Sequence, residues 1–163
     1  ITTYLCKMNV ILQKDQKHFP KMASIMSSTE PWITLQRDQA ACLASLQGEG
    51  KEVYSLEENG EVIGVVVLQM NGSFRGYLQV LCIDEKYRGK GYGKAAMAYC
   101  EKRIFSTSPN FFLCVSSFNT EAQKFYYNLG FSLVGEIKDF VLEGYSELLL
   151  RKTTGSFSSF NPQ

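Results

Sequence analysis

A pair of β-rich runs on either side of Asn59-Gly60 constrains the fold of this chain most. Residues 52–70 read EVYSLEENGEVIGVVVLQM, and β-branched or aromatic residues occur in both runs. Asn-Gly suits a two-residue turn between strands because both of its residues tolerate positive φ. The sequence therefore predicts a β-hairpin over these residues.

Hydrophobic spacing predicts the remaining helices and strands. Apolar residues recur at helical spacing in 18–28, 34–48, 91–105 and 120–129. Asn119 can cap the last of these helices, and Gly130 ends it. Short apolar runs predict strands around 10–12, 76–83, 111–115, 131–137 and 145–152. The predicted order is β-α-α-β-β-β-α-β-α-β-β in a single domain, residues 1–163, with a low-complexity tail at 152–163.

Length and charge limit the classes of partner. A chain of 163 residues with 45% apolar residues suits one domain with a full hydrophobic core. Its formal net charge of +1 gives no electrostatic reason to expect nucleic acid or a membrane surface as a partner. No apolar run approaches the ~20 residues of a membrane span, and no signal segment opens the chain. We therefore expect a cytoplasmic protein that binds through local sites.

Cysteine and histidine usage argues against metal and redox sites. The cysteines are odd in number and widely spaced without a C-x-x-C pair, and His18 is the only histidine. This pattern is not typical of a zinc site, a redox motif or a disulfide framework, so we expect no metal and a reducing compartment. The five cysteines are Cys6, Cys42, Cys82, Cys100 and Cys114.

The segment YRGKGYGKAA, residues 87–96, places three glycines between a predicted strand and a predicted helix. Alternate glycines let the backbone approach a ligand, and the helix directs free N–H groups at the same place, which favours an anion. A nucleoside-triphosphate loop needs glycine in place of Arg88 and a hydroxyl in place of Ala95. A dinucleotide-binding loop needs glycine in place of Lys94. Both kinds of site are therefore disfavoured.

The pattern that remains, R-G-x-G-x-G from Arg88 to Gly93, resembles the acyl-coenzyme A pyrophosphate loop of the GNAT acetyltransferase superfamily. The family's second signature is an Asn after the next strand, then an alanine, an aromatic residue or leucine followed by Tyr, and Leu-Gly-Phe. This chain has the same residues in the same order, namely Asn119, Ala122, Phe125, Tyr126, Leu129, Gly130 and Phe131. The resemblance is firm over residues 77–135.

The resemblance implies an α/β (α+β) fold in which about four helices flank a mixed, mostly antiparallel sheet of about seven strands. It also implies a bulge in strand 76–83, whose opened backbone at Leu81, Cys82 and Ile83 pairs with the pantetheine arm of acetyl-CoA. The Ile83 N–H would then polarise the acetyl carbonyl. The rest of the implied coenzyme A site is Arg88, Gly89, Lys90, Gly91, Tyr92, Gly93, Lys94, Asn119, Ala122, Phe125 and Tyr126.

Aminolysis of a thioester needs a neutral amine, a polarised carbonyl and a proton for the leaving thiolate. A phenol with a pKa of ~10 is close enough to a thiol at ~8.5 to supply that proton. The family register makes Tyr126 the proton donor, and Tyr127 is the second choice. Strand 76–83 contains no acid, so the base stays open between a water chain and one of three carboxylates, Glu30, Glu143 and Glu147.

The acceptor pocket of the family lies between the first helices and the last hairpin. In this chain that region supplies Glu30, Trp32, Arg37, Phe140 and Tyr145. Such a set could stack an apolar acceptor and pair an acceptor carboxylate with the arginine.

The sequence thus predicts an acetyl-CoA-dependent N-acetyltransferase that acts on a primary amine of a small molecule, a peptide or a protein. Transfer should be direct, because Cys82 lies inside a strand with no histidine to activate it. The alternative is a coenzyme A-binding module of the same fold without transferase activity. A monomer and a homodimer are both compatible with the sequence.

The C-terminal tail, residues 152–163, is polar and rich in glycine and serine. Chain ends of this composition are normally mobile unless something holds them. We expect Phe157 or Phe160 to pack against the body of the domain or a neighbouring chain.

Overall fold

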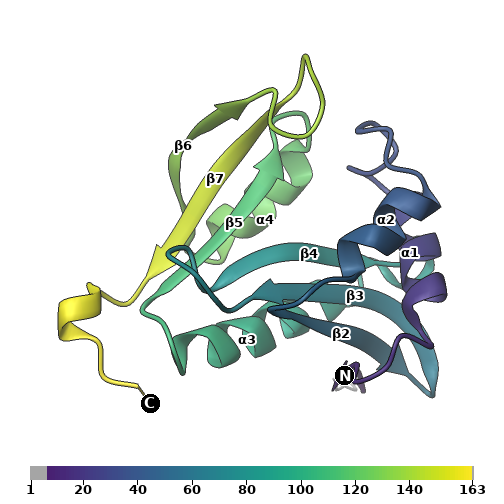
Figure 1. The fold of residues 1–163 in the computed structure, drawn as a ribbon, viewed down its shortest axis with the longest axis horizontal. Coiled ribbons are helices and arrows are strands. Elements are labelled where there is room, and N and C mark those ends of the chain that lie inside the picture. The colour runs from purple at the N-terminus through teal and green to yellow at the C-terminus, as the bar shows by residue number, and fades with distance from the viewer. Residues whose placement is uncertain (1–6, 163) are drawn as a thin grey trace, which may run out of the picture.

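The computed structural model describes residues 7–162, which form one seven-stranded sheet in the order β1-β2-β3-β4-β5-β7-β6, flanked by helices (Figure 1). Neighbouring strands are antiparallel except for β4 and β5, which are parallel. The predicted element order and mixed sheet are confirmed. The strands are β1 Asn9–Leu12, β2 Lys51–Glu58, β3 Glu61–Gln69, β4 Tyr77–Ile83, β5 Asn110–Ser116, β6 Ser132–Lys138 and β7 Ser146–Thr153. The α-helices are α1 Phe19–Ser27, α2 Gln39–Leu46, α3 Tyr92–Phe105 and α4 Thr120–Asn128.

The sheet opens like a V between β4 and β5 (Figure 1). These strands pair only at their beginnings, where Tyr77 lies opposite Phe112 and Leu78 lies opposite Leu113. Beyond these pairs, β5 continues beside β7 while β4 continues beside β3. The backbone of β4 therefore has a free edge on the side of β5.

The divergence follows a β-bulge in β4. Val67 of β3 pairs with Val80. The next residue of β3 pairs with Leu78, so Gln79 is an extra residue in β4. Leu78 and Val80 would share one face of a regular strand, but here they belong to hydrophobic clusters on opposite faces. The bulge that the family resemblance implied for this strand is confirmed.

Two hydrophobic cores hold the sheet, one on each face. Helix α3 covers one face with the apolar stripe that its sequence predicts, and α1 and α2 cover the other face over β2, β3 and β4. The stripe of α3 is Ala96, Met97, Cys100 and Ile104, each at most 2% exposed. The core under α1 and α2 includes Met22, Met26, Leu46, Val65 and Val67, again at most 1% exposed.

Local signals account for most element boundaries. Asn59 and Gly60 have φ values of 51° and 80°, as a two-residue hairpin turn requires, so the predicted hairpin is confirmed. Helix α2 begins later than predicted because Asp38 caps it, accepting a hydrogen bond from the Ala41 N–H at 2.8 Å. Leu35, which the helical spacing included, is buried in the turn before this helix.

The tail contacts the body of the domain, as predicted. The short 3-10 helix Phe157–Ser159 follows β7, and the Arg75 guanidinium lies 4.5 Å from the centroid of the Phe157 ring. The contact covers only part of the Phe157 ring, which remains 46% exposed.

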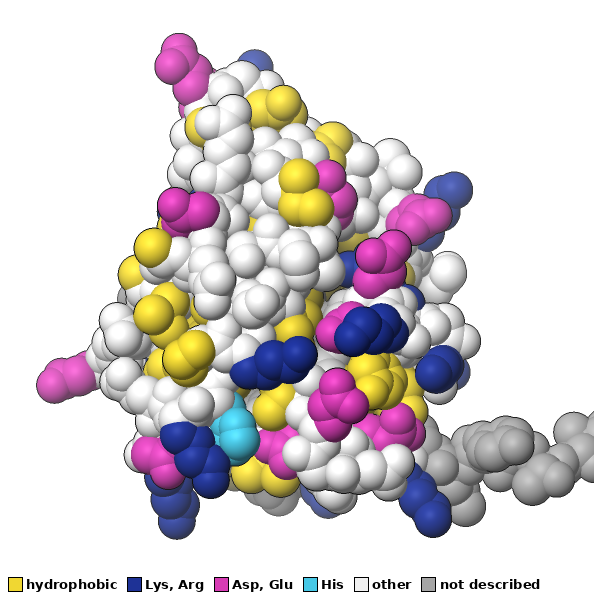
Figure 2. All heavy atoms as spheres, turned by 90° about the vertical axis from the view of Figure 1, so that its right-hand side faces the viewer, with side chains coloured by type: hydrophobic (Ala, Val, Ile, Leu, Met, Phe, Trp, Pro, Cys, Tyr) yellow, Lys and Arg dark blue, Asp and Glu magenta, His cyan; other side chains and the backbone are white. Residues whose placement is uncertain are grey.

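The face of the molecule on the side of α1 and α2 carries basic and acidic side chains in a mixed pattern (Figure 2). No basic stripe of the kind that binds nucleic acid is therefore seen on this face. Within residues 7–162, none of the helices is both long and apolar enough to cross a membrane.

Candidate active site

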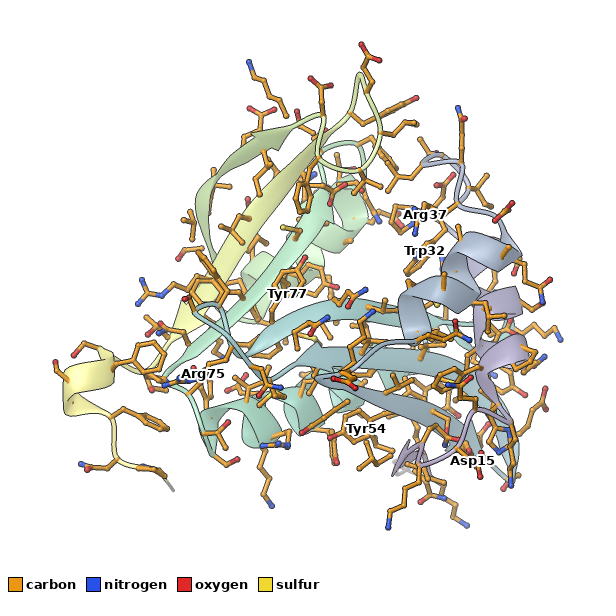
Figure 3. The ribbon with its side chains drawn as sticks, in the orientation of Figure 1. Asp15, Trp32, Arg37, Tyr54, Arg75 and Tyr77 are labelled. Atoms are coloured by element: carbon orange, nitrogen blue, oxygen red, sulfur yellow. The ribbon has the colours of Figure 1, made fainter. Side chains whose placement is uncertain are left out.

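A cleft of about 1220 Å³ occupies the opening between β4 and β5. Its walls come from the exposed edge of β4, the glycine loop, the start of α3, β5, α4, β7 and the segment between α1 and α2. Figure 3 shows Trp32 and Arg37 on the α1–α2 side of this opening and Tyr77 on the side of the β4–β5 junction.

The glycine loop forms the N-terminus of α3. Gly89 and Gly91 have φ values of 72° and 85°, and Gly91 is the N-cap residue of the helix. In the first turn of α3, the Ala95 N–H donates to the Gly91 carbonyl at 3.0 Å. Within the described residues, the N–H groups of Gly89, Gly93 and Lys94 have no backbone acceptor. The loop thus presents free donors at the positive end of a helix dipole.

Two tyrosines fix this loop to the β2–β3 hairpin. The Tyr87 hydroxyl donates to Glu61 Oε2 at 2.9 Å, and the Tyr92 hydroxyl donates to Glu58. Neither acid could be identified from the sequence, since nothing in a hairpin sequence indicates which distant loop the hairpin contacts. Lys90 was predicted to bind the cofactor, but its Nζ lies 5.2 Å from the Tyr87 ring centroid and it does not line the cleft.

The free edge of β4 directs backbone groups into the cleft. The Asp84 N–H donates to the Ile63 carbonyl of β3 at 2.8 Å. Successive backbone groups of a strand point in opposite directions, so the N–H of Ile83 points away from β3, toward the side from which β5 has diverged. Leu81, Cys82 and Ile83 all line the cleft, as the resemblance implied.

Tyr126 lies on α4 at the wall of the cleft and is 9% exposed. Its ring makes edge-to-face contacts with Phe125 and Phe131, at centroid distances of 5.2 and 5.9 Å. Burial raises the pKa of the Tyr126 hydroxyl above its usual value. Asn119 caps the helix by accepting from the Ala122 N–H at 3.2 Å, as predicted.

Tyr127, the alternative proton donor, is 40% exposed and does not line the cleft. The remaining residues of the implied coenzyme A site do line it: Arg88, Gly89, Gly91, Tyr92, Gly93, Lys94, Asn119, Ala122 and Phe125.

The thiol of Cys82 is buried beneath α1, and its sulfur lies 3.2 Å from the Thr29 hydroxyl oxygen. Burial raises the pKa of this thiol to about 12, so it carries no thiolate at neutral pH. Among the described residues, no group of three or more His, Cys, Asp or Glu side chains could hold a metal ion.

The three candidate bases have different surroundings. Glu30 lines the cleft, but its carboxylate accepts hydrogen bonds from the Thr34 N–H and hydroxyl at 3.1 and 2.9 Å. Glu143 is exposed in the β6–β7 hairpin and lies outside the cleft lining. Glu147 is 6% exposed, lines the cleft and accepts a hydrogen bond from the Ser116 hydroxyl at 2.6 Å.

The predicted acceptor residues meet in the cleft with one exception. Glu30, Trp32, Arg37 and Phe140 line it. Tyr145 does not, because its ring packs edge to face on Phe118 at a centroid distance of 5.5 Å. The alternation of side chains along the last strand could not predict the orientation of Tyr145, because this residue precedes β7 in the hairpin loop.

Comparison with known proteins identifies the family to which this fold belongs. Residues 17–131 match the model of the Acetyltransferase (GNAT) family. None of the curated proteins matches the chain. Among solved structures, a protein from Desulfovibrio desulfuricans assigned to the GNAT family is 16% identical, with a TM-score of 0.73 over 91% of this chain and 99% of that one.

Two further solved structures have the same fold. An aminoglycoside N-acetyltransferase complexed with coenzyme A is 12% identical, with a TM-score of 0.69 over 91% of this chain and 98% of that one. A variant of spermidine N-acetyltransferase from Vibrio cholerae is 13% identical, with a TM-score of 0.68 over 90% of this chain and 93% of that one. Since the family match spans residues 17–131, well over half of the sequence, the chain belongs to the acetyltransferase (GNAT) family and is an N-acetyltransferase.

Proposed function

We propose that this protein transfers the acetyl group of acetyl-CoA directly to a primary amine of a small molecule or a peptide. The observation that carries the proposal is the convergence of three features on one cleft. They are the free N–H groups of the glycine loop, the unpaired edge of β4 at Ile83, and Tyr126.

The glycine loop fits the phosphates of acetyl-CoA, the substrate that supplies an activated acetyl thioester. A Cβ atom added to Gly89 or Gly91 would meet no other protein atom within 4 Å, so the loop faces open space. The N–H groups of Gly93 and Lys94 add donors at the helix N-terminus, where an anion is stabilised. The coenzyme A complex of the aminoglycoside acetyltransferase of the same fold is consistent with this assignment.

The edge of β4 is suited to hold and polarise the acetyl group. An extended ligand can pair with the backbone groups of Leu81 and with the Ile83 N–H in the way that a strand pairs with a sheet edge, while the Ile83 carbonyl accepts a hydrogen bond from Arg88 Nε at 3.2 Å. In this role the Ile83 N–H donates to the acetyl oxygen, where negative charge grows during transfer.

Tyr126 is suited to hold a proton until the sulfur leaves. Because burial raises its pKa, the hydroxyl remains protonated through neutral pH. It is a weaker acid than an exposed tyrosine, so the pKa difference from a thiol is larger than the unperturbed values suggested. Because a thiolate is a weaker base than this phenolate, the proton transfer is uphill on its own and must be coupled to C–N bond formation, after which the phenolate recovers a proton from nitrogen.

The acceptor side of the cleft combines aromatic and charged groups. Trp32 and Phe140 offer ring surfaces, and Arg37 offers a guanidinium on the same side as Trp32 (Figure 3). These groups suit an amine whose body is apolar or aromatic and which carries an acidic group at a distance.

A screen of primary amines with acetyl-CoA, read as release of free thiol, tests the proposal. Amine-dependent release of coenzyme A and formation of the N-acetyl product are the expected results. Tight coenzyme A binding by calorimetry without turnover on any amine would instead indicate a coenzyme A-binding module.

Direct transfer predicts that Cys82→Ala keeps its activity. The thiol is buried and protonated, so it offers no nucleophile, and kcat should stay within about three-fold of the parent. Removing a buried sulfur leaves a small cavity, so the melting temperature should fall. Loss of turnover in a folded variant that still binds coenzyme A would point to a covalent cysteine intermediate.

A further inference from the structure

Glu147 is a buried carboxylate that opens into the cleft. Its Oε1 accepts the hydrogen bond from Ser116, while Oε2 has no hydrogen-bond partner within residues 7–162. No fully buried side-chain oxygen or nitrogen in this part of the chain lacks a partner, so Oε2 reaches the solvent of the cleft. No lysine or arginine of these residues forms an ion pair with it.

The strand order explains this position. Ser116 of β5 lies directly opposite Glu147 of β7. The alternate residues of β5 face the core under α3 and α4, which leaves Cys114 and Ser116 on the face that opens into the V. Tyr77, at the start of β4, lies beside Cys114. Glu147 and the proposed proton donor Tyr126 both line the cleft.

The surroundings of Glu147 contain no compensating charge. Burial raises the pKa of its carboxyl, and the hydrogen bond from Ser116 offsets this only in part. Burial also raises the pKa of Tyr77 and of Cys114, so both stay neutral at physiological pH. From β6 the residue opposite is Ile137, which is apolar. A buried, ionised carboxylate without a cation is costly, and a cationic ligand would offset that cost.

We propose that Glu147 binds the ammonium group of the acceptor and accepts one of its protons, which restricts the acceptors to amines that are cationic at neutral pH. This inference rests on the proposed acetyl transfer. Of the carboxylates that the sequence offered as the base, Glu147 is the one selected, and the acceptor has to carry a positive charge.

One ammonium N–H bond breaks, and its proton goes to Glu147 Oε2, which leaves a lone pair on nitrogen. That pair forms the C–N bond as the C–S bond breaks, and sulfur takes the proton of the Tyr126 hydroxyl. The second nitrogen proton returns to the Tyr126 oxygen through water, and Glu147 releases its proton to solvent.

The test compares Glu147→Gln with the matched control Glu143→Gln, which alters an exposed acid of the same hairpin. The probes are 2-phenylethylamine, which is cationic at neutral pH, and aniline, which is neutral. For 2-phenylethylamine, kcat/KM should fall by ~10²-fold in Glu147→Gln and stay within about two-fold in the control. Coenzyme A affinity by calorimetry should not change, and any rate on aniline should change by less than about three-fold.

Two further readouts separate this role from a structural one. In the parent, kcat/KM for 2-phenylethylamine should rise with pH as Glu147 ionises through its raised pKa, and Glu147→Gln should lack this rise.

Because the folded-state pKa of Glu147 lies above its unfolded value, its stabilising contribution is present at low pH and is lost as pH rises through the folded pKa. Glu147→Gln should therefore melt higher than the parent at about pH 8, with the difference closing near pH 3. A structural carboxylate predicts a lower melting temperature.

Equal rates on 2-phenylethylamine in the parent and in Glu147→Gln would overturn this inference and leave the proposed acetyl transfer intact. If the parent acetylates no amine, the proposed transfer itself fails, and calorimetry with 2-phenylethylammonium chloride decides the ammonium site. Binding to the parent that is lost in Glu147→Gln supports the site. Equal binding in both proteins, or no binding to the parent, overturns it.

Discussion

Replacing Tyr126 by Phe should lower kcat by ~10²- to 10⁴-fold, the usual contribution of a general acid. The ring that packs against Phe125 and Phe131 remains in this variant, so folding and coenzyme A affinity should change little. The proton is needed only as the sulfur leaves, so kcat and kcat/KM should fall together while KM for acetyl-CoA stays within a few-fold. Steady-state kinetics on the best amine of the screen, with calorimetry for coenzyme A, measures these quantities.

Tyr127→Phe is the matched control, because it removes the same hydroxyl from the next residue of the helix. Tyr127 lies outside the cleft, so its variant should keep parental kinetics. A kcat of Tyr126→Phe within about two-fold of the parent would rule out the acid role. A lower melting temperature with unchanged turnover would make the hydroxyl a structural group.

Replacing Gly91 by Glu should abolish measurable coenzyme A binding while the domain stays folded. Gly91 is the N-cap of α3 and its missing side chain faces open space, so a carboxylate there would occupy the anion site and repel phosphate. Calorimetry with coenzyme A measures the loss, and circular dichroism confirms the fold.

Two controls separate charge from backbone strain. Gly91→Ala imposes a side chain on the same left-handed backbone, at φ 85°, without adding a charge, so it should weaken coenzyme A binding far less. Gly72→Glu places the same carboxylate on a left-handed glycine of the β3–β4 turn, where φ is 81° and a Cβ likewise meets no other atom within 4 Å, so it should bind normally. Near-parental affinity in a folded Gly91→Glu variant would remove the phosphate assignment.

The parts of the fold that could be predicted from the sequence are those with local causes. The hairpin at Asn59-Gly60, the apolar stripe of α3 and the Asn119 cap each depend on residues that are neighbours along the chain. The glycine loop was also predictable, because a helix N-terminus and its glycines lie within one short segment.

The features that could not be predicted depend on where distant strands lie. Glu147 was only one of three candidate acids until the order β5-β7-β6 placed it opposite Ser116, facing the open V. Tyr145 packs on Phe118 and the Lys90 ammonium lies over the Tyr87 ring, neither residue lines the cleft, and neither orientation has a local sequence signal. Only the family resemblance indicated that β4 would separate from β5.

The extra residue Gln79 makes the existence of the cleft depend on chain length at one position. Deleting it would leave the pairing partners of β3 in place, since Val67 and Leu68 already face Val80 and Leu78. It would, however, remove the bend after which β4 leaves β5, and the two strands could pair along their whole length. The product would be a continuous sheet with more backbone hydrogen bonds and no room for substrates. In evolutionary terms, we expect a single-codon deletion at this position to be enough to close the cleft and abolish activity.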